Sequence, residues 1–259
     1  MSKTKFGLVT GAAGLLGFEH CKTLLNSGYG VIMLDINKSA LDKKYKELSK
    51  KYKKLPIKKF YTNITSESDL SKLTKKVKKD KIFIRVLINN ACIDPKPKKN
   101  TKVKNILKSW DKELSVGLKG SYLMIEYFSK NMIDNKDGCI INIASDLSII
   151  APNQSIYKNV YKNFVKPVTY SVIKHGIIGL TKYYAASLAR FNITCNAISP
   201  IGIYNNQSKK FVKNLTNLIP MGRMAKTEDI NNTTSFLINE NQKFITGQNI
   251  VIDGGRTIL

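Results

Sequence analysis

Short apolar runs rich in Val, Ile and Leu alternate along the chain with longer stretches whose apolar residues recur at helical spacing. The apolar runs predict buried strands at residues 6–10, 31–35, 56–61, 86–91, 139–145, 193–199 and 249–253. The longer stretches predict helices at residues 15–27, 38–54, 66–79, 106–131, 170–191 and 226–239. This alternation favours the α/β class, with a Rossmann-type, doubly wound parallel sheet and helices on both faces. No linker or repeat divides the sequence, so we expect a single domain over residues 1–259.

A glycine-rich segment, Thr-Gly-Ala-Ala-Gly-Leu-Leu-Gly at residues 10–17, joins the first predicted strand to the first predicted helix. Glycines there let the backbone approach a pyrophosphate, and the start of the helix offers free N–H groups and the positive end of its dipole. The second strand ends at Asp35, whose carboxylate can accept hydrogen bonds from an adenosine ribose and would repel a 2′-phosphate. Together they predict an NAD site rather than an NADP site, with a turn or helix-capping role for Asp35 as the alternative.

Tyr170 and Lys174 place a phenol and an ammonium group four residues apart, on one face of a predicted helix. A nearby ammonium group favours the phenolate and so lowers the pKa of a tyrosine from its usual value of about 10. Tyr170 could then act as an acid or base near neutral pH. The spacing is common in helices, so an ordinary surface pair is the alternative for these two residues alone.

In this order and register the motifs resemble the short-chain dehydrogenase/reductase family, and the likeness covers nearly the whole chain. Besides the glycine-rich segment and the Tyr170–Lys174 pair, it rests on the segments at residues 89–92 (Asn-Asn-Ala-Cys), 141–145 (Ile-Asn-Ile-Ala-Ser), 199–202, 219–223, 245–248 and 253–255. The resemblance implies an NAD-dependent enzyme that interconverts a secondary alcohol and a ketone, with no metal ion. Family members are commonly tetramers built on the helices that hold Gly117 and Tyr170, so we expect a homo-oligomer, a tetramer.

The resemblance also implies residue roles. Tyr170 would exchange a proton with the substrate oxygen, Lys174 would hold the nicotinamide ribose and lower the pKa of Tyr170, and Ser145 would hydrogen-bond the substrate carbonyl or hydroxyl. The oxidised nicotinamide ring is cationic and would add to the electrostatic effect on Tyr170. The residues implied to bind NAD are Gly11, Gly14, Leu15, Leu16, Gly17, Asp35, Ile36, Asn63, Ile64, Asn90, Ala91, Ile143, Tyr170, Lys174, Pro200 and Ile203.

Asn63 and Gly117 are among the positions that depart from the family pattern. Asn63 stands where the family usually has Asp beside the adenine, and we expect its amide oxygen to accept a hydrogen bond from the adenine amine. Gly117 stands where the family has an Asn that helps hold a water in a proton relay behind the active-site lysine. Glycine within a helix lowers the stability of the helix, so its presence here needs an explanation. Two interpretations of Gly117 are open. Either the helix is kinked and the Gly117 carbonyl still holds the relay water, or the activity is reduced.

The segment between Ser145 and Tyr170, residues 146–169, is about twice as long as the family's usual one. Because the implied catalytic residues lie at both its ends, we expect it to cover the substrate pocket, with a solvated surface insertion as the alternative. A cover of this kind would suit a polar or anionic substrate such as a sugar derivative. The lysines that it would bring are Lys158, Lys162 and Lys166.

The formal net charge of +25 allows nucleic acid, a membrane surface or an anionic substrate as a partner. Only four of the 43 basic residues are arginines, although nucleic-acid readers rely on arginine, so we expect no nucleic-acid partner. No apolar run is long enough to span a bilayer, and the first residues show no secretory pattern, so we expect no membrane partner. Four widely spaced cysteines fit free thiols in the cytoplasm, and two histidines make a metal site improbable.

Two alternatives to the small-molecule dehydrogenase remain open. The first is a catalytically weakened, NAD-binding scaffold or sensor of the same fold, which the replacement at Gly117 favours. The second is a 3-oxoacyl-carrier-protein-type reductase, for which a basic surface could dock an acidic carrier. Those relatives generally prefer NADP, which Asp35 opposes. The sequence also bears a faint likeness to bacterial members of surface-sugar pathways, and this favours a sugar-derived substrate.

Overall fold

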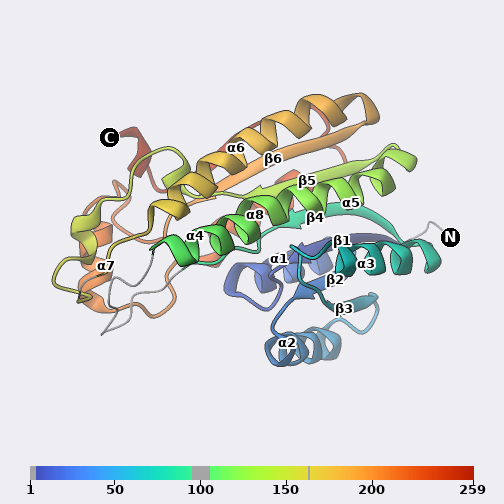
Figure 1. Ribbon diagram of the computed structural model, residues 1–259, viewed down its shortest axis with the longest axis horizontal. Helices are drawn as coiled ribbons and strands as arrows, with labels where there is room; N and C mark the ends of the chain where they lie inside the picture. The colour runs from blue at the N-terminus through green and yellow to red at the C-terminus, as the bar shows by residue number, and fades with distance from the viewer. Residues whose placement is uncertain (1–3, 95–105, 163) are drawn as a thin grey trace.

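Seven parallel strands form one sheet in the order β3-β2-β1-β4-β5-β6-β7, which confirms the doubly wound α/β fold (Figure 1). The computed structural model describes residues 4–94, 106–162 and 164–259. The chain builds outward from β1 to β3, then returns to the other side of β1 through β4. The carboxyl ends of β1 and β4 therefore flank the point where a doubly wound sheet binds its ligand. The strands are β1 (Lys5–Thr10), β2 (Gly30–Asp35), β3 (Ile57–Tyr61), β4 (Phe83–Asn89), β5 (Gly138–Ile143), β6 (Ile193–Pro200) and β7 (Asn249–Ile252).

Helices cover both faces of the sheet, as the alternating pattern predicted (Figure 1). One face carries α1 (Leu15–Asn26), α2 (Lys38–Lys51) and α8 (Thr227–Ile238). The other carries α3 (Glu67–Lys79), α5 (Gly120–Asp134) and α6 (Val168–Leu188). A further helix, α7 (Lys209–Thr216), was not predicted; it is short, and its buried Leu215 packs beside Tyr157.

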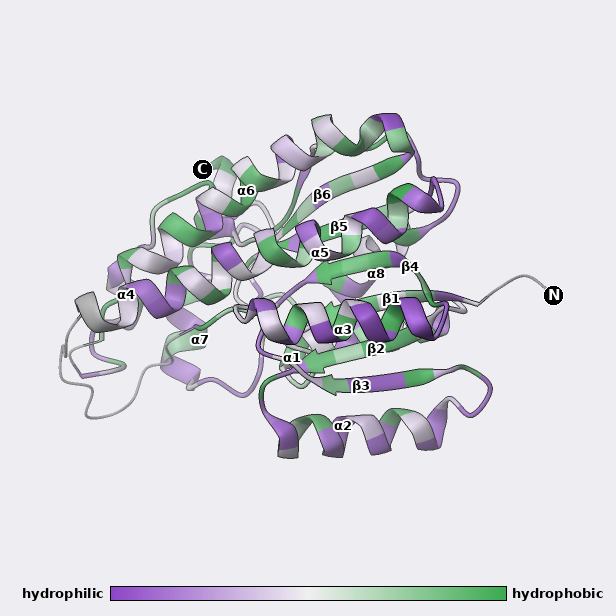
Figure 2. Ribbon diagram, turned by 45° about the vertical axis from the view of Figure 1, so that its right-hand side comes forward, coloured by the Kyte–Doolittle hydropathy of each residue, from purple (hydrophilic) through white to green (hydrophobic). Residues whose placement is uncertain are grey.

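The core consists of two apolar layers separated by the sheet. Successive strand residues point to opposite faces, so Leu8 packs into the layer under α3, α5 and α6, and Val9 packs into the layer under α1, α2 and α8. All seven residues of β4 are buried, as expected for a strand covered on both sides. Figure 2 shows apolar strands at the centre and a largely polar outer surface on α2.

The long helix predicted over residues 106–131 is interrupted. It consists of α4 (Ile106–Leu114), one turn of π-helix at Ser115–Lys119, and then α5. The wider turn contains Gly117, the residue that departs from the family pattern. Such turns bulge out of an α-helix and are frequent at functional sites.

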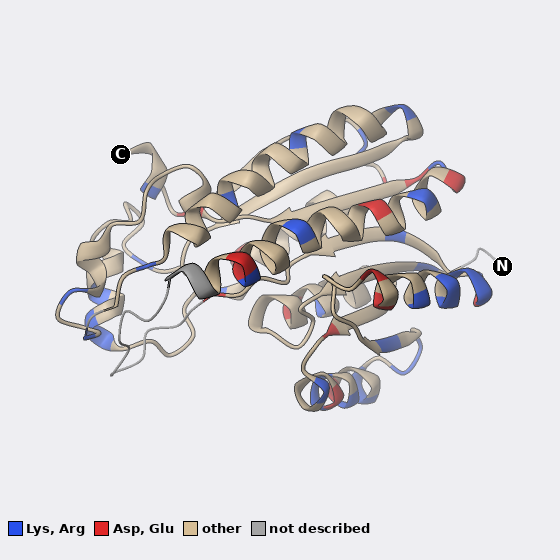
Figure 3. Ribbon diagram, in the orientation of Figure 1, with Lys and Arg blue, Asp and Glu red and all other residues tan. Residues whose placement is uncertain are grey.

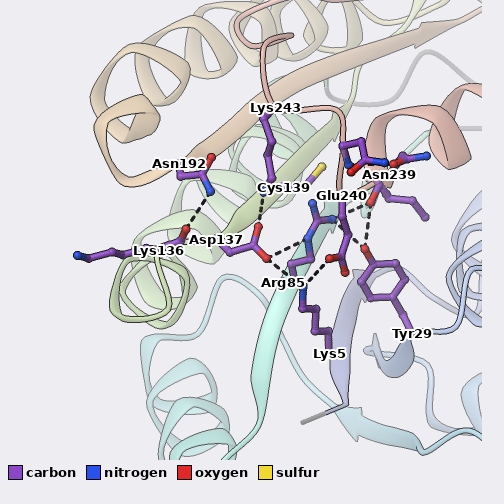
Figure 4. Close-up of polar contacts among 12 residues, drawn as sticks. Lys5, Tyr29, Arg85, Lys136, Asp137, Cys139, Asn192, Asn239, Glu240 and Lys243 are labelled. Carbon is purple, nitrogen blue, oxygen red and sulfur yellow. Dashed lines mark hydrogen bonds and ion pairs between the residues drawn. The ribbon is translucent and has the colours of Figure 1, made fainter. Parts of the chain in front are cut away.

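A cluster of charged side chains lies at the amino ends of the strands (Figure 4). Arg85, on β4, is 1% exposed. Its guanidinium pairs with Asp137 and donates hydrogen bonds to the Tyr29 hydroxyl at 2.9 Å and the Ile238 carbonyl at 2.7 Å. Lys243 also pairs with Asp137. Ionic and polar contacts therefore link distant segments of the chain at this end of the sheet.

Most other basic residues are spread over the outside of the protein, Lys174 and Arg256 being buried. Figure 3 shows them scattered along α2, α3 and the region of α7. This distribution is typical of a solvated surface. Within residues 4–94, 106–162 and 164–259, none of the helices has the length and apolar character needed to cross a bilayer.

Candidate active site

The glycine-rich turn forms a close backbone cradle between β1 and α1. Gly11 has φ +63°, a left-handed conformation that favours glycine. A Cβ atom at Gly17 would lie 2.1 Å from the Gly11 carbonyl oxygen, so no larger residue fits there. Gly14 begins α1 without a side-chain cap, and the first turn holds no acidic residue. The N–H groups at the start of α1 are therefore suited to an anion such as a pyrophosphate.

Asp35 fastens this cradle to the end of β2. Its Oδ2 accepts a hydrogen bond from the Ala13 N–H at 3.0 Å, and its Oδ1 accepts one from the Asn37 N–H at 2.8 Å. Asn37, rather than Asp35, caps α2. A carboxylate has about four lone-pair sites, so Asp35 can still accept hydrogen bonds from a ribose. Its charge would repel a phosphate at the same place.

The end of β4 is tied to the same turn. The Asn90 side-chain amide donates to the carbonyls of Thr10, at 3.0 Å, and Gly11, at 3.2 Å. The Thr10 hydroxyl in turn accepts from the N–H groups of Asn90 and Ala91 at 3.0 Å each. The structure thus brings Asn90 and Ala91 to the glycine-rich turn, although 79 to 81 residues separate the partners.

Ser145, Tyr170 and Lys174 meet beside the carboxyl end of β5. Ser145 follows β5, whereas Tyr170 and Lys174 lie on α6. Ser145 is among the side chains that influence the pKa of Tyr170, so the two side chains lie close together. The Lys174 Nζ lies 5.5 Å from the centre of the Tyr170 ring and donates to the Ile143 carbonyl at 2.7 Å. Lys174 is buried, which excludes the alternative of an ordinary surface pair.

The pKa of Tyr170 runs against the expectation. Burial raises it well above the usual value, and the negative charges of Asp94 and Asp146 act in the same direction. A hydrogen bond donated by Ser145 would lower it. The expectation that Lys174 lowers the pKa of Tyr170 is therefore not met by these side chains alone.

The other residues implied for the cofactor lie near the same edge. Leu15 and Ile36 expose apolar side chains, 44% and 74% respectively, as a surface for rings would require. The Asn63 Oδ1 already accepts from both the N–H and the hydroxyl of Thr65. Its amide nitrogen, a donor, is the group that remains for a base, which corrects the expectation that the oxygen would serve. Four further residues lie after β3, within α1 or at the end of β6: Leu16, Ile64, Pro200 and Ile203.

The arrangement fits a dinucleotide. The cradle admits only glycine at its narrowest point, the helix start offers uncapped N–H groups, and Asp35 stands one strand away. Across residues 4–94, 106–162 and 164–259, no three His, Cys, Asp or Glu side chains gather in a way that could hold a metal ion.

Comparison with known proteins agrees with this geometry. The model of a family described as Enoyl-(Acyl carrier protein) reductase matches residues 11–257. An NAD-dependent glycerol dehydrogenase of Listeria innocua is 30% identical, over 98% of this chain and 94% of its own length. The chain belongs to the short-chain dehydrogenase/reductase family.

Further relatives of the same family differ in what they are described as acting on. A 3-oxoacyl-[acyl-carrier-protein] reductase of Thermotoga maritima is also 30% identical, over 98% of each chain. The NAD⁺-bound structure of a short-chain dehydrogenase from Leptospira borgpetersenii has a TM-score of 0.82 at 28% identity, covering 98% of this chain and 93% of that one. An NAD⁺-bound xylitol dehydrogenase has a TM-score of 0.82 at 25% identity, covering 98% and 99%. The chain is thus an oxidoreductase by family.

The family's relay position, Gly117, lies in the π-helical turn. The helix is thus irregular at this residue, and both interpretations of Gly117 remain predictions. A Cβ atom at this position would lie 2.7 Å from the Ile173 Cγ2, because the Ile173 side chain packs against the glycine. The Gly117 carbonyl accepts a hydrogen bond from the Ser121 hydroxyl at 3.1 Å. An asparagine side chain would need Ile173 to move.

The long segment at 146–169 brings one of its three lysines to the site. Lys158 and Lys162 are exposed and line a surface hollow that contains none of Ser145, Tyr170 and Lys174. Lys166 instead lies with its Nζ 3.8 Å from the centre of the Tyr170 ring, a cation–π contact.

Two contacts hold Lys166 in that place. Gln154 hydrogen-bonds both the N–H and the carbonyl of Lys166, at 2.9 and 3.2 Å. The Lys166 ammonium pairs with Asp94. The segment also has its own small core, in which Tyr157 stacks on Phe211 of α7. It is therefore a packed structure beside Tyr170 rather than a loose surface loop.

Three buried charged residues at the site were not predicted. Glu113, at the end of α4, accepts a hydrogen bond from the Thr169 hydroxyl, next to Tyr170. Asp146 contacts Ser145 and pairs with Arg256, which lies beyond β7. No motif marks Arg256, and only its position after the Asp-Gly-Gly segment could have drawn attention to it.

Proposed function

We propose that the protein is an NAD(H)-dependent oxidoreductase that interconverts a secondary alcohol and a ketone on a polar, sugar-derived or polyol substrate. The meeting of Ser145, Tyr170 and Lys174 beside a dinucleotide cradle carries this proposal. Residues 1–259 would act as one catalytic domain, with residues 146–169 as the insertion on the substrate side. Tyr170 is its acid/base, Ser145 contacts the substrate oxygen, and Lys174 positions the ribose.

Each of these side chains has a part that its contacts support. When bound, the nicotinamide dinucleotide supplies the hydride and, in its oxidised form, a positive charge. The Ile143 carbonyl aims the Lys174 ammonium, and that ammonium lies on the same side as the Tyr170 ring. Tyr170 holds its proton when it faces only its protein neighbours, because burial raises its pKa. It would protonate a ketone oxygen directly, and alcohol oxidation would need added positive charge to favour the phenolate.

Asp35 supports NAD rather than NADP as the cofactor. Its carboxylate is fixed by two backbone N–H groups, so the charge stays at the end of β2. Several relatives support NAD, since the Listeria protein is named as NAD-dependent and two structural neighbours hold NAD⁺, although another neighbour holds NADP.

Lys166 supports a polar or anionic substrate. Its ammonium lies over the Tyr170 ring, where a substrate carboxylate or hydroxyl could replace Asp94 as its partner. Relatives described as acting on glycerol and xylitol are in keeping with a polyol.

We also propose that the protein is a cytoplasmic homotetramer that binds neither nucleic acid nor membranes. The outer faces of α5 and α6 expose large apolar side chains, as an interface between copies would require. These are Tyr122 (43% exposed), Val172 (40%) and Tyr183 (68%). Three of the four free cysteines are buried, which suits a reducing compartment.

The experiment that tests the reaction is a panel of alcohols with NAD⁺ and of the matching ketones with NADH. Glycerol and dihydroxyacetone, xylitol and xylulose, and an aldonic acid with its keto form are the pairs to use, with absorbance at 340 nm as the readout. We expect turnover of at least one pair. NADH binding without turnover of any pair would instead support the scaffold or sensor.

A specific observation favours the carrier-protein reductase as second candidate: the Thermotoga relative is as similar as the glycerol dehydrogenase. An acetoacetyl thioester with NADPH tests it. Faster turnover with that pair than with any polyol and NAD⁺ would replace the proposed substrate class and cofactor together.

A further inference from the structure

The hydroxyl of Ser145 has almost all of its hydrogen-bonding capacity in use. It donates to the Asp146 Oδ1 at 2.7 Å, and it accepts from the Leu147 N–H at 3.2 Å. A serine hydroxyl has one proton and two lone pairs. Only one lone pair of Ser145 therefore remains for Tyr170 or a substrate.

An ion pair holds Asp146 in this role. Its Oδ2 accepts from the Arg256 Nη1 at 2.5 Å, and both side chains are less than 10% exposed. The backbone on both sides of Arg256 is held by Asp253, whose carboxylate accepts from the N–H groups of Gly255, at 3.0 Å, and Thr257, at 2.7 Å. A carboxylate paired with the Arg256 guanidinium stays an acceptor for the serine.

We propose that the Asp146–Arg256 ion pair commits the Ser145 proton to Asp146, so that Tyr170 is the only hydroxyl that donates to the substrate oxygen. This inference rests on the oxidoreductase function proposed above. Asp146 and Arg256 act through Ser145 and touch no reacting atom, so they are positioning residues.

The direction of this hydrogen bond affects the proton on Tyr170. A serine that donated to Tyr170 would stabilise the phenolate, but a serine whose proton is committed elsewhere cannot do so. Neutral Tyr170 is the form that protonates a ketone, so the pair favours ketone reduction near neutral pH. The charged and titratable groups that face Tyr170 are Cys92, Asp94, Asp146, Lys166 and Lys174.

Two double variants separate the acceptor at position 146 from its charge: Asp146→Asn with Arg256→Met, and Asp146→Ala with Arg256→Met. Both remove the same two charges, and replacing a buried ion pair as a unit is well tolerated. Only asparagine keeps an oxygen that can accept from Ser145 and Leu147. The measurement is kcat/KM for oxidation of glycerol and xylitol at saturating NAD⁺ between about pH 6 and pH 10, whose acidic limb reports the pKa of Tyr170 in the NAD⁺ complex.

We expect the acidic limb of the alanine double variant to lie about one pH unit or more below that of the asparagine double variant, because Ser145 is then free to donate to the phenolate. This corresponds to about tenfold more activity at the same low pH. Coincident limbs overturn the inference while the proposed function stands. If the wild-type protein oxidises no alcohol, the proposed function falls, and this inference falls with it.

Two further variants serve as a substitute and as a control. Asp146→Leu with Arg256→Met fills the space of the carboxylate and replaces the alanine double variant if that protein does not fold. Asp137→Asn removes a carboxylate that pairs with the other buried arginine, at the opposite end of the sheet. The acidic limb of its kcat/KM profile should coincide with that of the wild-type protein. A shift as large as that of the alanine double variant would overturn the inference.

Discussion

Two buried arginines each pair with a carboxylate, at opposite ends of the same sheet. At the amino end, Arg85 pairs with Asp137, which also pairs with Lys5 and Lys243. At the carboxyl end, Arg256 is the only cation that pairs with Asp146 within the described residues. The first pair is thus part of a network of three cations, and the second stands alone.

The difference shows in the pKa values of the two carboxyl groups. Burial acts to raise the pKa of Asp137, but Lys243, Arg85 and Lys5 outweigh it and lower the pKa. Burial also raises the pKa of Asp146, and there Arg256 offsets only part of the effect. The cations around Asp137 therefore outweigh the cost of burying its carboxylate, whereas Arg256 does not fully offset that cost for Asp146. One oxygen of Asp146 also contacts Ser145.

Removal of Arg256 gives the largest expected effect, and removal of Arg85 is the matched comparison. Arg256→Met leaves Asp146 buried without a cation and should lower the free energy of unfolding by about 3–5 kcal/mol. Arg85→Met should cost less, about 1–2 kcal/mol, because Asp137 keeps two lysines. Urea unfolding of the two variants and the wild-type protein measures both values.

The pH dependence sharpens this comparison. A carboxyl group whose folded-state pKa is raised weakens the fold when it is ionised, so its cost is present above that pKa and fades as the pH falls through it. Both deficits should shrink on acidification, that of Arg256→Met at a higher pH, because the pKa of Asp146 is raised whereas Lys5 and Lys243 still lower that of Asp137. Equal deficits with the same pH dependence would show that the two pairs are equivalent.

A smaller effect on the free energy of unfolding is expected from His20, a buried titratable side chain that forms no ion pair among the described residues. Burial lowers its pKa to about 4, and its Nε2 has no hydrogen-bond partner within the described residues. Stability from the neutral ring is present above the unfolded pKa near 6.5 and is lost as the pH falls toward 4. The loss should be about 3 kcal/mol.

His20→Leu removes this ionisation and should unfold with a free energy that depends less on pH in that range. Urea unfolding of both proteins at several pH values between about 4 and 7 gives the difference between them. An identical pH dependence in the two proteins would mean that the His20 ring is not kept neutral by burial.

The smallest expected effect is on cofactor preference and concerns Asp35. Its carboxylate is held by two backbone N–H groups rather than by a cation. Asp35→Asn keeps the shape but removes the charge that would repel a 2′-phosphate. The ratio of kcat/KM with NAD⁺ to that with NADP⁺ should fall about tenfold, a change of about 1.4 kcal/mol. A ratio that does not change would assign cofactor choice to other residues.

The doubly wound parallel sheet, though not its strand order, and the meeting of the implied site residues could be predicted from the sequence. Both depend on patterns that short segments carry by themselves: apolar runs for strands, and motifs for Ser145, Tyr170 and Lys174. The predicted strand and helix limits moved by a few residues, which is usual where elements fray.

The features that the sequence did not predict depend on contacts between distant segments. Asp146 and Arg256 are 110 residues apart, and nothing in either local pattern indicates their pairing. The close contact that leaves no room for a Cβ at Gly117 comes from Ile173, a residue of another helix. Of the three lysines expected near the substrate, contacts with Gln154 and Asp94 select Lys166, and such contacts exist only in the folded protein.

The most direct test of the central claim is the rate of hydride transfer in Tyr170→Phe. Phenylalanine keeps the ring that faces Lys166 and Lys174, so NADH should bind with a Kd within about threefold of the wild-type value. Stopped-flow oxidation of bound NADH by dihydroxyacetone or xylulose should slow by about 10³-fold or more, because the proton donor is lost. An unchanged rate would contradict the assignment of Tyr170 as the acid/base of this protein.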